Sequence, residues 1–372
     1  MRAAVLHEYG DPLTVTDVPD PDPAEHGVVV ETEACGICRS DWHAWQGHGE
    51  WADDQVPTGQ ILGHEPAGTV VDVGSRVESV REGDRVAVPF NLGRGRCSYC
   101  LNGHGNACEN GIALGFEEEA PGAFAEQVHA PYADYNVVRL PDGVGATEMA
   151  ALGCRFATAY HALAHRADLT PGDWVAVHGC GGVGLSAVQV ATALGANVVA
   201  VDVDDATLDR AADLGAAETV NARTAGDGVN ASGTGGDRNE ADADVPAAIR
   251  ALTDGGADVS VDALGVAETC RNSIACLRRR GQHVQLGLTT DAERGEVALP
   301  TDAMTMREVT FLGSRGMPPS RYGELLRMVE RDTVDPGALV TREVSLSDVP
   351  DRLAAMGDYG TAGIEVVTDF SG

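Results

Sequence analysis

Hydrophobic residues follow two different patterns along this chain. In residues 1–154, short Val-rich stretches such as Gly27–Glu33 and Gly68–Val73 are interrupted by Gly, Pro and Asp, which predicts strands joined by turns. In residues 155–315, strand-length apolar runs alternate with helix-length segments, which is typical of βαβ units in a doubly wound parallel sheet. We therefore expect an α/β chain with two domains, one β-rich and one built on a parallel sheet.

The second pattern predicts specific elements. The expected strands are Trp174–His178, Asn197–Val203, Asp258–Ala263 and His283–Leu288, and the expected helices are Val183–Leu194 and Ala206–Leu214. The segment Arg223–Asp244 is rich in Gly, Asp, Asn and Thr, so we expect a surface insertion there.

The tail after about residue 316 changes pattern again. It predicts helices at Arg321–Arg331 and Leu346–Met356 and a closing strand at Ile364–Thr368, which we expect to rejoin the first domain. The predicted domains are thus 1–154 with 316–372, and 155–315.

Charge sets this chain apart from ordinary globular proteins. Its 372 residues carry a formal net charge of −31, and all 26 basic residues are Arg, with no Lys. The composition resembles that of proteins from extreme halophiles, in which concentrated salt screens neighbouring carboxylates from one another. An acidic protein of an ordinary organism is the alternative. Because a nucleic-acid partner needs a basic face, none is expected.

No targeting or membrane pattern is evident. Met1–Leu6 runs directly into strand-like sequence, without the long apolar core and cleavage site of an export signal. Apolar runs such as Val198–Val201 are too short to span a bilayer. We therefore expect a soluble, cytoplasmic protein without a membrane partner. In that compartment the nine Cys are better interpreted as metal ligands and buried thiols than as disulfides.

A glycine-rich turn follows the predicted strand Trp174–His178. It reads Gly179-Cys180-Gly181-Gly182-Val183-Gly184 and leads into a predicted helix, so this GxGxxG motif stands in the context that dinucleotide binding requires. The first glycine permits a tight turn, the second lets backbone approach a diphosphate, and the third allows close helix packing. The residues expected to bind the cofactor are Gly179, Gly181, Gly182, Val183 and Gly184.

Asp202 ends the next predicted strand. At this distance from a glycine motif, a carboxylate hydrogen-bonds the adenosine ribose hydroxyls of NAD. The additional phosphate of NADP would meet like charges from Asp204 and Asp205 with no Arg immediately adjacent, so we expect NAD. Solvating surface acids are the alternative interpretation.

Cysteines and histidines of the first domain form a second chemical signature. Cys35-Gly36-Ile37-Cys38-Arg39-Ser40-Asp41-Trp42-His43 is followed by Gly63-His64-Glu65 and by Gly153-Cys154. Together with Gly122–Glu126 and the glycine motif, these residues resemble the zinc-dependent alcohol dehydrogenase family of medium-chain dehydrogenases, along essentially the whole chain. The resemblance implies a GroES-like, β-rich catalytic domain and a Rossmann coenzyme domain.

By this resemblance Cys38, His64 and Cys154 are the expected ligands of one catalytic zinc, with Asp41 orienting His64 and Glu65 as an occasional substitute ligand. Two thiolates and one imidazole leave a tetrahedral ion with an open fourth position, as catalytic zinc requires. An alcohol bound there loses its proton near neutral pH. A redox-active CxxC pair and a structural core histidine are the alternative interpretations.

The resemblance also implies roles for neighbouring residues. Ser40 passes the alcohol proton through the nicotinamide ribose to His43, and Arg39 binds the cofactor diphosphate. The residues expected to line a mostly apolar substrate pocket are Trp45 and Phe90, with Trp42 near the same turn.

The residue at position 154 bears on the class of substrate. Polyol dehydrogenases of the same superfamily usually carry Glu where this chain has Cys154, which favours simple primary or secondary alcohols. A polyol or sugar dehydrogenase is the alternative within the family, and a nonenzymatic NAD-binding or redox-sensing protein is the alternative outside it. The intact Ser40, His43 and ligand set argue against the latter. By resemblance to microbial relatives we expect a homotetramer.

A second cysteine group departs from the family pattern. Many members hold a structural zinc with four cysteines spaced C-x2-C-x2-C-x7-C, whereas here Cys97, Cys100 and Cys108 fit the last three places and Arg94 stands at the first. A guanidinium offers no lone pair to a metal, and three thiolates need a fourth donor to close a structural site. We therefore expect this zinc to be absent or weakly bound.

Overall fold

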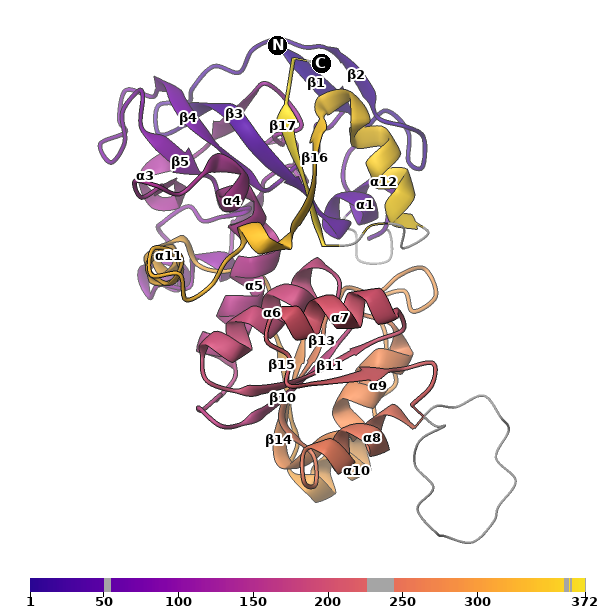
Figure 1. Ribbon diagram of the computed structural model, residues 1–372. Coiled ribbons are helices and arrows are strands. Elements are labelled where there is room, and N and C mark those ends of the chain that lie inside the picture. Colours follow the sequence, from indigo (N-terminus) through magenta and orange to yellow (C-terminus); the bar gives the residue numbers. More distant parts are fainter. Residues whose placement is uncertain (50–54, 226–243, 358–360, 362, 372) are drawn as a thin grey trace, which may run out of the picture. The chain divides into compact units, whose positions relative to one another are not determined.

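The computed structural model describes residues 1–49, 55–225, 244–357, 361 and 363–371, and it forms two compact units (Figure 1). Unit 1 comprises Met1–Thr158 and Gly316–Gly372, and unit 2 comprises Ala159–Arg315. The chain therefore leaves unit 1, forms unit 2 and returns. Each unit has its own sheet and its own core.

Unit 2 is built on a six-stranded parallel sheet in the order β12-β11-β10-β13-β14-β15. The strands are β10 (Trp174–His178), β11 (Asn197–Asp202), β12 (Glu218–Asn221), β13 (Ala257–Asp262), β14 (Leu277–Gln285) and β15 (Thr310–Gly313). The strand order reverses between β10 and β13. In doubly wound sheets, the carboxyl ends of strands at such a reversal border the ligand site.

Helices cover both faces of this sheet. They are α6 (Gly182–Ala193), α7 (Asp205–Asp213), α8 (Val245–Leu252), α9 (Ala267–Ala275) and α10 (Thr301–Arg307). Because crossovers between parallel strands are right-handed, the reversal places α6 and α7 on one face and α8 and α9 on the other. Strand β10 is therefore buried on both sides, which explains its continuous apolar sequence.

Unit 1 is built on a seven-stranded, mostly antiparallel sheet in which β3 pairs with β4, β8 and β17. The strands are β3 (Val28–Ile37), β4 (Pro66–Val73), β5 (Arg85–Ala87), β8 (Gln127–Ala130), β9 (Val138–Arg139), β16 (Val340–Ser345) and β17 (Ile364–Asp369). Two further pairs are β1 (Arg2–Val5) with β2 (Thr14–Asp17), and β6 (Asn91–Leu92) with β7 (Ile112–Ala113). The long strand β3 thus joins the N-terminal strands to the C-terminal strand β17.

Short helices complete unit 1. They are α1 (Arg39–Trp45), α2 (Ser98–Leu101), α3 (Ala133–Asn136), α4 (Ala146–Ala151), α11 (Tyr322–Val329) and α12 (Val349–Gly357), while α5 (Ala157–His161) spans the boundary with unit 2. Helix α11 buries Tyr322, Leu325, Leu326 and Val329. This spacing places all four side chains on one face of the helix.

Strand β14 departs from its predicted bounds. The predicted strand His283–Leu288 is wrong in its bounds, because β14 begins at Leu277 and ends at Gln285; the run Arg278–Arg280 concealed its first half. Residues 226–243 of the predicted insertion lie outside the described residues. Among the described residues, no helix is long and apolar enough to cross a bilayer.

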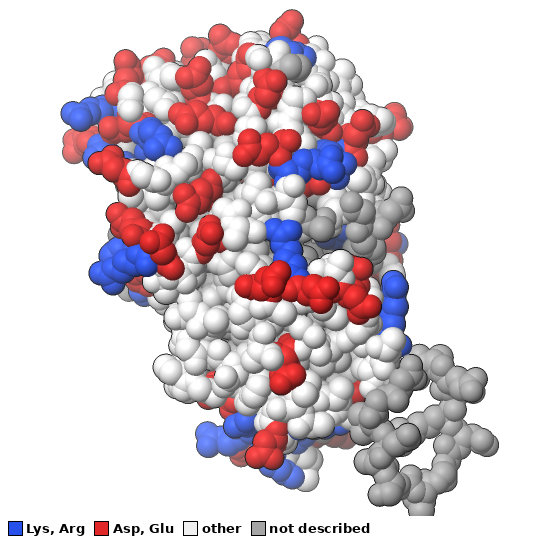
Figure 2. Space-filling view, viewed as in Figure 1, with Lys and Arg blue, Asp and Glu red and all other residues white. Residues whose placement is uncertain are grey.

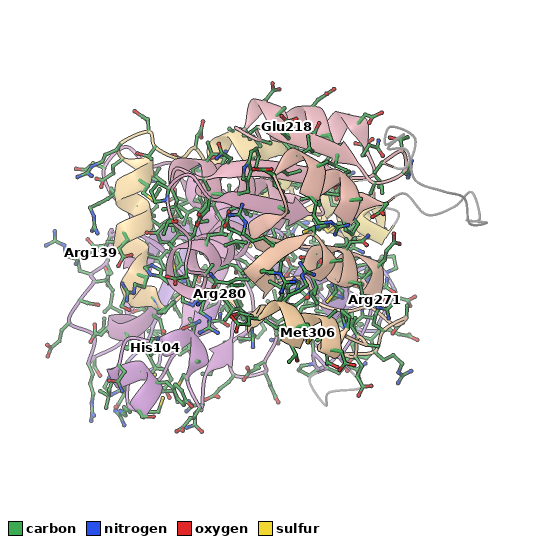
Figure 3. The ribbon with its side chains drawn as sticks, turned by 90° about the horizontal axis from the view of Figure 1, so that it is seen from below. His104, Arg139, Glu218, Arg271, Arg280 and Met306 are labelled. Carbon is green, nitrogen blue, oxygen red and sulfur yellow. The ribbon has the colours of Figure 1, made fainter. Side chains whose placement is uncertain are left out.

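Acidic side chains are spread over the molecular face in Figure 2, with few basic ones between them. Two of the exposed arginines labelled in Figure 3 have acidic partners: Arg139 contacts Asp84 at 2.8 Å, and Arg280 contacts Glu308 at 3.5 Å. The ammonium group of Met1 likewise donates to Asp20, at 2.6 Å. Since acids outnumber bases by 57 to 26, most acids have no basic partner to neutralise them.

Two glycines of the β10–α6 turn make different demands on the fold. A Cβ at Gly184 would lie 1.9 Å from the carbonyl oxygen of Gly179, whereas a Cβ at Gly181 would meet nothing within 4 Å. We predict that Gly184→Ala lowers the free energy of unfolding by about 1–3 kcal/mol, because backbone must move to admit the methyl group. The matched control Gly181→Ala should change it by about 1 kcal/mol or less. Equal denaturant midpoints for the two variants would contradict this view of the turn.

Candidate functional site

Three segments of unit 1 bring cysteine and histidine side chains together. Cys38 lies between β3 and α1, where it is the residue before the first turn of the helix. His64 and Glu65 precede β4. Cys154 lies in the π-helical segment Leu152–Phe156, and Gly153 before it has a non-helical backbone conformation (φ −37°, ψ −113°). Residues far apart in the sequence therefore meet at one end of the sheet.

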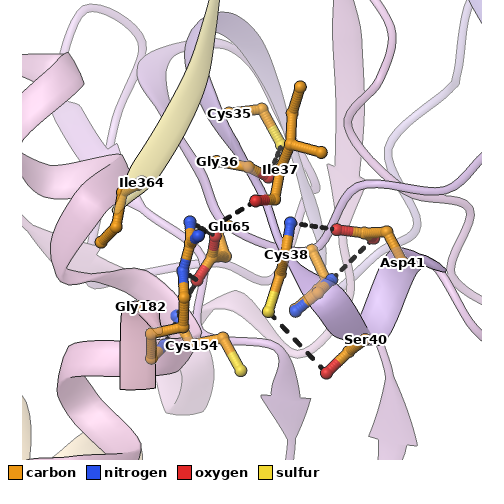
Figure 4. A network of polar contacts seen from close by, with 12 residues as sticks. Cys35, Gly36, Ile37, Cys38, Ser40, Asp41, Glu65, Cys154, Gly182 and Ile364 are labelled. Atoms are coloured by element: carbon orange, nitrogen blue, oxygen red, sulfur yellow. Dashed lines mark hydrogen bonds and ion pairs between the residues drawn. The ribbon is translucent and has the colours of Figure 1, made fainter. Parts of the chain in front are cut away.

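The side chains of Cys38, His64, Glu65 and Cys154 form a buried cluster in which one potential ligand atom from each lies within 4.8 Å of the others. Figure 4 shows the sulfur atoms of Cys38 and Cys154 beside Ser40 and Glu65. Such distances allow several atoms to contact a single ion at the bond lengths of zinc, about 2.0–2.3 Å.

The imidazole of His64 is held in one orientation. Its Nδ1 lies 2.8 Å from Oδ1 of Asp41, and the same carboxylate accepts the backbone N–H groups of Cys38 at 2.9 Å and Gly63 at 3.0 Å. With Nδ1 hydrogen-bonded to Asp41, Nε2 is the ring atom that remains for a metal ion. Within the described part of the chain this buried Nε2 has no hydrogen-bond partner, which is the arrangement that a carboxylate–histidine pair gives to a metal ligand. The donor set fits zinc.

The two buried thiols of this cluster influence each other strongly. A hydrogen bond from Cys154 holds the pKa of Cys38 well below its usual value, and His64 acts in the same direction. The hydrogen bond to Cys38 and burial raise the pKa of Cys154 well above its usual value. The hydrogen bond therefore makes one thiol of the pair more acidic at the expense of the other; a divalent cation would stabilise both as thiolates.

The carboxylate of Glu65 is already occupied. Its oxygens accept the backbone N–H of Cys154 at 2.8 Å and the guanidinium Nη2 of Arg155 at 2.5 Å. Burial raises the pKa of Glu65, and the charge of Arg155 opposes that effect. The sequence did not identify Arg155, although a basic residue directly after a ligand cysteine in an otherwise apolar stretch was a possible signal.

The residues expected to handle protons and cofactor lie along α1. The hydroxyl of Ser40 is 3.8 Å from the sulfur of Cys38. The ring nitrogen Nδ1 of His43 is 2.8 Å from Nδ1 of His48. Arg39 lies over the ring of Trp42, at 4.3 Å, and donates to the carbonyl of Met356 at 2.9 Å. Helix α1 therefore carries Ser40, His43 and Arg39 directly after the cluster.

The aromatic residues expected around the substrate occupy different places. The ring of Phe90 lies 5.5 Å from that of His64, and Phe116, which the sequence did not reveal, lies 4.8 Å from it. Trp45 is buried and its indole N–H donates to the carbonyl of Asp11 at 2.5 Å. Of the expected set, Phe90 thus lies against the ring of His64, while the side chain of Trp42 packs beside Arg39 and Trp45 is anchored to the N-terminal segment.

The glycine motif of unit 2 forms a tight turn at the carboxyl end of β10. Gly179 has φ of +84°, a left-handed conformation that favours glycine. Gly181 precedes the helix, and Gly182 and Val183 form the first turn of α6. The open space where a Cβ of Gly181 would stand leaves the backbone N–H groups at the helix start accessible to an anion.

Asp202 lies at the end of β11 beside this turn. One carboxylate oxygen accepts the N–H of Cys180 at 2.7 Å, and the other accepts the N–H groups of Val203 at 2.7 Å and Asp204 at 3.1 Å. The side chain therefore holds the glycine turn and the following loop together. Each carboxylate oxygen can accept more than one hydrogen bond, so a ribose hydroxyl is still compatible with it.

The second cysteine group also assembles. The sulfur of Cys97 lies 3.5 Å from that of Cys100 and 3.7 Å from that of Cys108. Backbone N–H groups of Cys100 and Glu109 lower the pKa of Cys97 to about 7. Three thiols are thus preorganised, with one in reach of ionisation at neutral pH.

Arg94 turns its side chain toward other partners. The guanidinium donates to Glu119 at 2.8 Å, to the hydroxyl of Tyr132 at 3.0 Å and to the carbonyl of Asn110 at 2.8 Å. Its backbone N–H, in contrast, reaches the thiol of Cys108. Position 94 therefore adjoins the thiols but supplies an ion pair instead of a fourth ligand.

Comparisons with known proteins agree along the chain. Residues 24–142 match the alcohol dehydrogenase GroES-like domain, and residues 182–331 match the zinc-binding dehydrogenase domain. An alcohol dehydrogenase of Geobacillus stearothermophilus is 41% identical over 59% of this chain, which spans 63% of that relative. An NAD-dependent alcohol dehydrogenase of Sulfurisphaera tokodaii is 31% identical over 99% of each chain, and a sorbitol dehydrogenase of Halalkalibacterium halodurans is 30% identical over 94% of each. The solved alcohol dehydrogenase of Aeropyrum pernix superposes with a TM-score of 0.85 at 30% identity, over 99% of this chain and 100% of that one.

The three-cysteine group generates a prediction about metal content. We predict that the protein retains close to one zinc per chain after dialysis against a mild chelator, because Arg94 leaves the second site without a fourth ligand. Arg94→Cys should raise the retained zinc toward two, since position 94 adjoins Cys108. The control Arg94→Ala removes the ion pair with Glu119 without adding a thiol, so its count should stay near one. Two zincs retained by the unaltered protein would refute the interpretation of Arg94.

Proposed function

We propose that this chain, a member of the zinc-dependent alcohol dehydrogenase family, reversibly oxidises small primary or secondary alcohols to aldehydes or ketones with NAD. When bound, NAD would supply the acceptor for the hydride of the carbinol carbon, and the hydroxyl proton would leave through the protein to solvent. The observation that carries this proposal is the unpartnered Nε2 of His64, aimed into a cluster with the thiols of Cys38 and Cys154.

Cys38, His64 and Cys154 would hold the metal. When bound, zinc supplies a Lewis acid that lowers the pKa of an alcohol hydroxyl. Asp41 keeps His64 in the tautomer that offers Nε2, and its hydrogen bond to the N–H of Cys38 fixes the start of α1. The protein thereby sets the ligand geometry before any substrate arrives.

Ser40 and His43 are proposed to carry the proton away. The hydroxyl of Ser40, next to the sulfur of Cys38, can accept a proton from the substrate while donating its own onward. His43 accepts at its imidazole, which makes it the general base of the path. Phe90 and Phe116, packed around His64, limit the water that reaches the reacting carbon.

The proposed cofactor site uses the amino end of α6 and the end of β11. The N–H groups at Gly181, Gly182 and Val183 bind the diphosphate, and Asp202 accepts hydrogen bonds from the ribose. The family resemblance assigns a further cofactor contact to Arg39, which is fixed by its hydrogen bond to Met356.

A polyol dehydrogenase is the second candidate, supported by the likeness to the sorbitol dehydrogenase. The aromatic surroundings of His64 favour simple alcohols instead, because a polyol needs several hydrogen-bond partners in its pocket. Steady-state rates with one secondary alcohol, one polyol and one aldose in the presence of NAD distinguish the two candidates.

The metal ligands supply the first test. We predict that replacing Cys38, His64 or Cys154 with Ala lowers kcat/KM for alcohol oxidation by about 10³-fold or more, because stabilisation of the developing alkoxide charge, worth several kcal/mol, is lost. Cys35→Ala is the matched control: it removes a buried thiol from the same CxxC, which lies outside the cluster, and should leave the rate nearly unchanged. Near-normal turnover in any ligand variant would exclude the proposed mechanism, and loss of activity in Cys35→Ala would favour a redox pair.

The proposed role of Asp202 gives a test of cofactor choice. We predict that NAD is used more efficiently than NADP and that Asp202→Gly reduces the ratio about 10- to 100-fold, the value of a hydrogen bond to a charged group. Asp202→Asn, which keeps an acceptor for the N–H of Cys180, separates loss of charge from loosening of the glycine turn. Equal efficiency of both cofactors in the unaltered protein would contradict the proposal.

We further propose that the protein works in a salt-rich cytoplasm, as a homotetramer. The net charge of −31 and the absence of Lys support the first part, and the family resemblance supports the second. A light-scattering mass near four times 38.6 kDa in concentrated KCl would agree with a tetramer, and a monomer mass would exclude it.

Salt dependence follows from the same charge. We predict that the thermal midpoint rises steeply between dilute buffer and several molar KCl, because a Debye length of about 3 Å at 1 M screens repulsion between carboxylates. Below about 1 M salt, structure or activity should be lost. Midpoints that do not change with KCl concentration would show that the acidic surface is not a salt adaptation.

A further inference from the structure

We propose that Arg155 is a positioning residue for the metal site: paired with Glu65, it holds together the backbone segments that carry the metal ligands. The inference rests on the proposed zinc site and concerns a residue next to it. Among the described residues, the guanidinium of Arg155 hydrogen-bonds Glu65 and the carbonyl of Ile37 and not a proposed ligand side chain, so it acts through Glu65 and the main chain.

The guanidinium of Arg155 joins two segments. Its Nη2 donates to Oε2 of Glu65 at 2.5 Å, its Nε lies 3.3 Å from Oε1, and its Nη1 donates to the carbonyl of Ile37 at 3.0 Å. The side chain of Arg155 is 5% exposed and that of Glu65 is fully buried. A planar fork with five donors is suited to this task, because it contacts a carboxylate and a carbonyl at once.

Glu65 completes the connection. Its Oε1 also accepts the backbone N–H of Cys154 at 2.8 Å and that of Arg155 at 3.3 Å. Every proposed ligand therefore has a chain neighbour in this network: Ile37 precedes Cys38, Glu65 follows His64, and Arg155 follows Cys154. A shift of any one segment must break a buried, charge-assisted hydrogen bond.

Two glycines of the surrounding backbone leave space for the side chain of Glu65. A Cβ at Gly36 would lie 2.1 Å from Oε2 of Glu65, and a Cβ at Gly153 would lie 2.7 Å from the Cβ of Glu65. Both glycines flank residues of the network, and both allow the Glu65 side chain to lie against the main chain; Figure 4 shows Gly36 near Glu65. The site is thus shaped around the ion pair.

Charge gives the pair a second effect. Two thiolates and the buried carboxylates of Asp41 and Glu65 would surround a divalent ion, so the cluster is anionic even when loaded. The positive charge of Arg155 neutralises that of Glu65. Among the described residues, Arg155 is the one guanidinium hydrogen-bonded to this carboxylate. Removing it leaves Glu65 charged and unpaired in the interior, a costly state.

Zinc affinity and the spectrum of the cobalt-substituted protein test this inference without reference to turnover. We expect Arg155→Leu to bind zinc about 10- to 100-fold more weakly, the usual effect of losing a group that orients a metal ligand. The thiolate-to-cobalt charge-transfer and d–d bands should shift, because the Cys38 and Cys154 segments are no longer fixed. In Glu65→Gln/Arg155→Leu, which also removes the orphaned charge, the thermal midpoint should recover relative to Arg155→Leu alone, whereas zinc affinity should stay low because the segments are still not fixed.

Arg352→Leu is the matched control. Arg352 makes a two-point pair with the buried Glu365 in the same unit, at 2.7 Å for each contact, but neither residue adjoins a proposed ligand in sequence. We expect Arg352→Leu to lower the thermal midpoint while zinc affinity and cobalt bands stay as in the unaltered protein. An equal loss of zinc in Arg352→Leu and Arg155→Leu would overturn the inference, since the effect would then be one of general stability.

Arg155→Lys is a second variant that tests the same inference if Arg155→Leu does not fold. An ammonium retains the charge but cannot span Glu65 and the carbonyl of Ile37 together, so zinc affinity should fall to an intermediate value with shifted cobalt bands. Unchanged affinity and bands in Arg155→Lys would overturn the positioning role. If the unaltered protein binds neither zinc nor cobalt through thiolates, both the proposed function and this inference are wrong. If the unaltered protein binds both metals and the Arg155 variants bind them equally well, only this inference is wrong.

Discussion

The buried carboxylate of Asp41 is the contact on which the proposed metal centre depends. It accepts hydrogen bonds from the N–H of Cys38, the N–H of Gly63 and the ring of His64, and so fixes two proposed ligands from separate segments. A buried carboxylate is stable in the interior only when such donors surround it. The hydrogen bonds of Asp41 thus hold the start of α1 against the segment that carries His64.

The two sheets present chemistry in different ways. In unit 1, Cys38 and His64 lie where β3 ends and β4 begins, so the antiparallel pairing of these strands brings them together, and Cys154 joins them from the π-helical segment. In unit 2, the turn after β10 and the end of β11 meet because parallel strands place their carboxyl ends along one edge. Each site is therefore built from strand ends, where side chains are free of the sheet yet held by it.

Much of the fold and of the candidate site could be predicted from local sequence patterns. The strand β10 and the glycine turn after it were predictable because a continuous apolar run, a tight turn and a helix start are all short-range patterns. The cysteine and histidine cluster was identifiable because its motifs match a family. In contrast, the Glu65–Arg155 pair joins residues that are far apart in sequence, and nothing in the neighbourhood of either residue specifies the other. Strand β14 was placed too late because its arginines lack the alternation of an ordinary half-buried strand.

The salt bridge between Met1 and Asp20 has a consequence for the chemistry proposed for this chain. Aldehydes condense with unprotonated primary amines to give Schiff bases, and in most proteins lysine side chains are the targets. This chain has no Lys, and the hydrogen bond from Met1 to Asp20 raises the pKa of the amino group, which disfavours its unprotonated form. An enzyme that releases aldehydes would thereby offer its own product almost no nucleophilic amine, and would resist the slow carbonyl damage that accompanies such turnover.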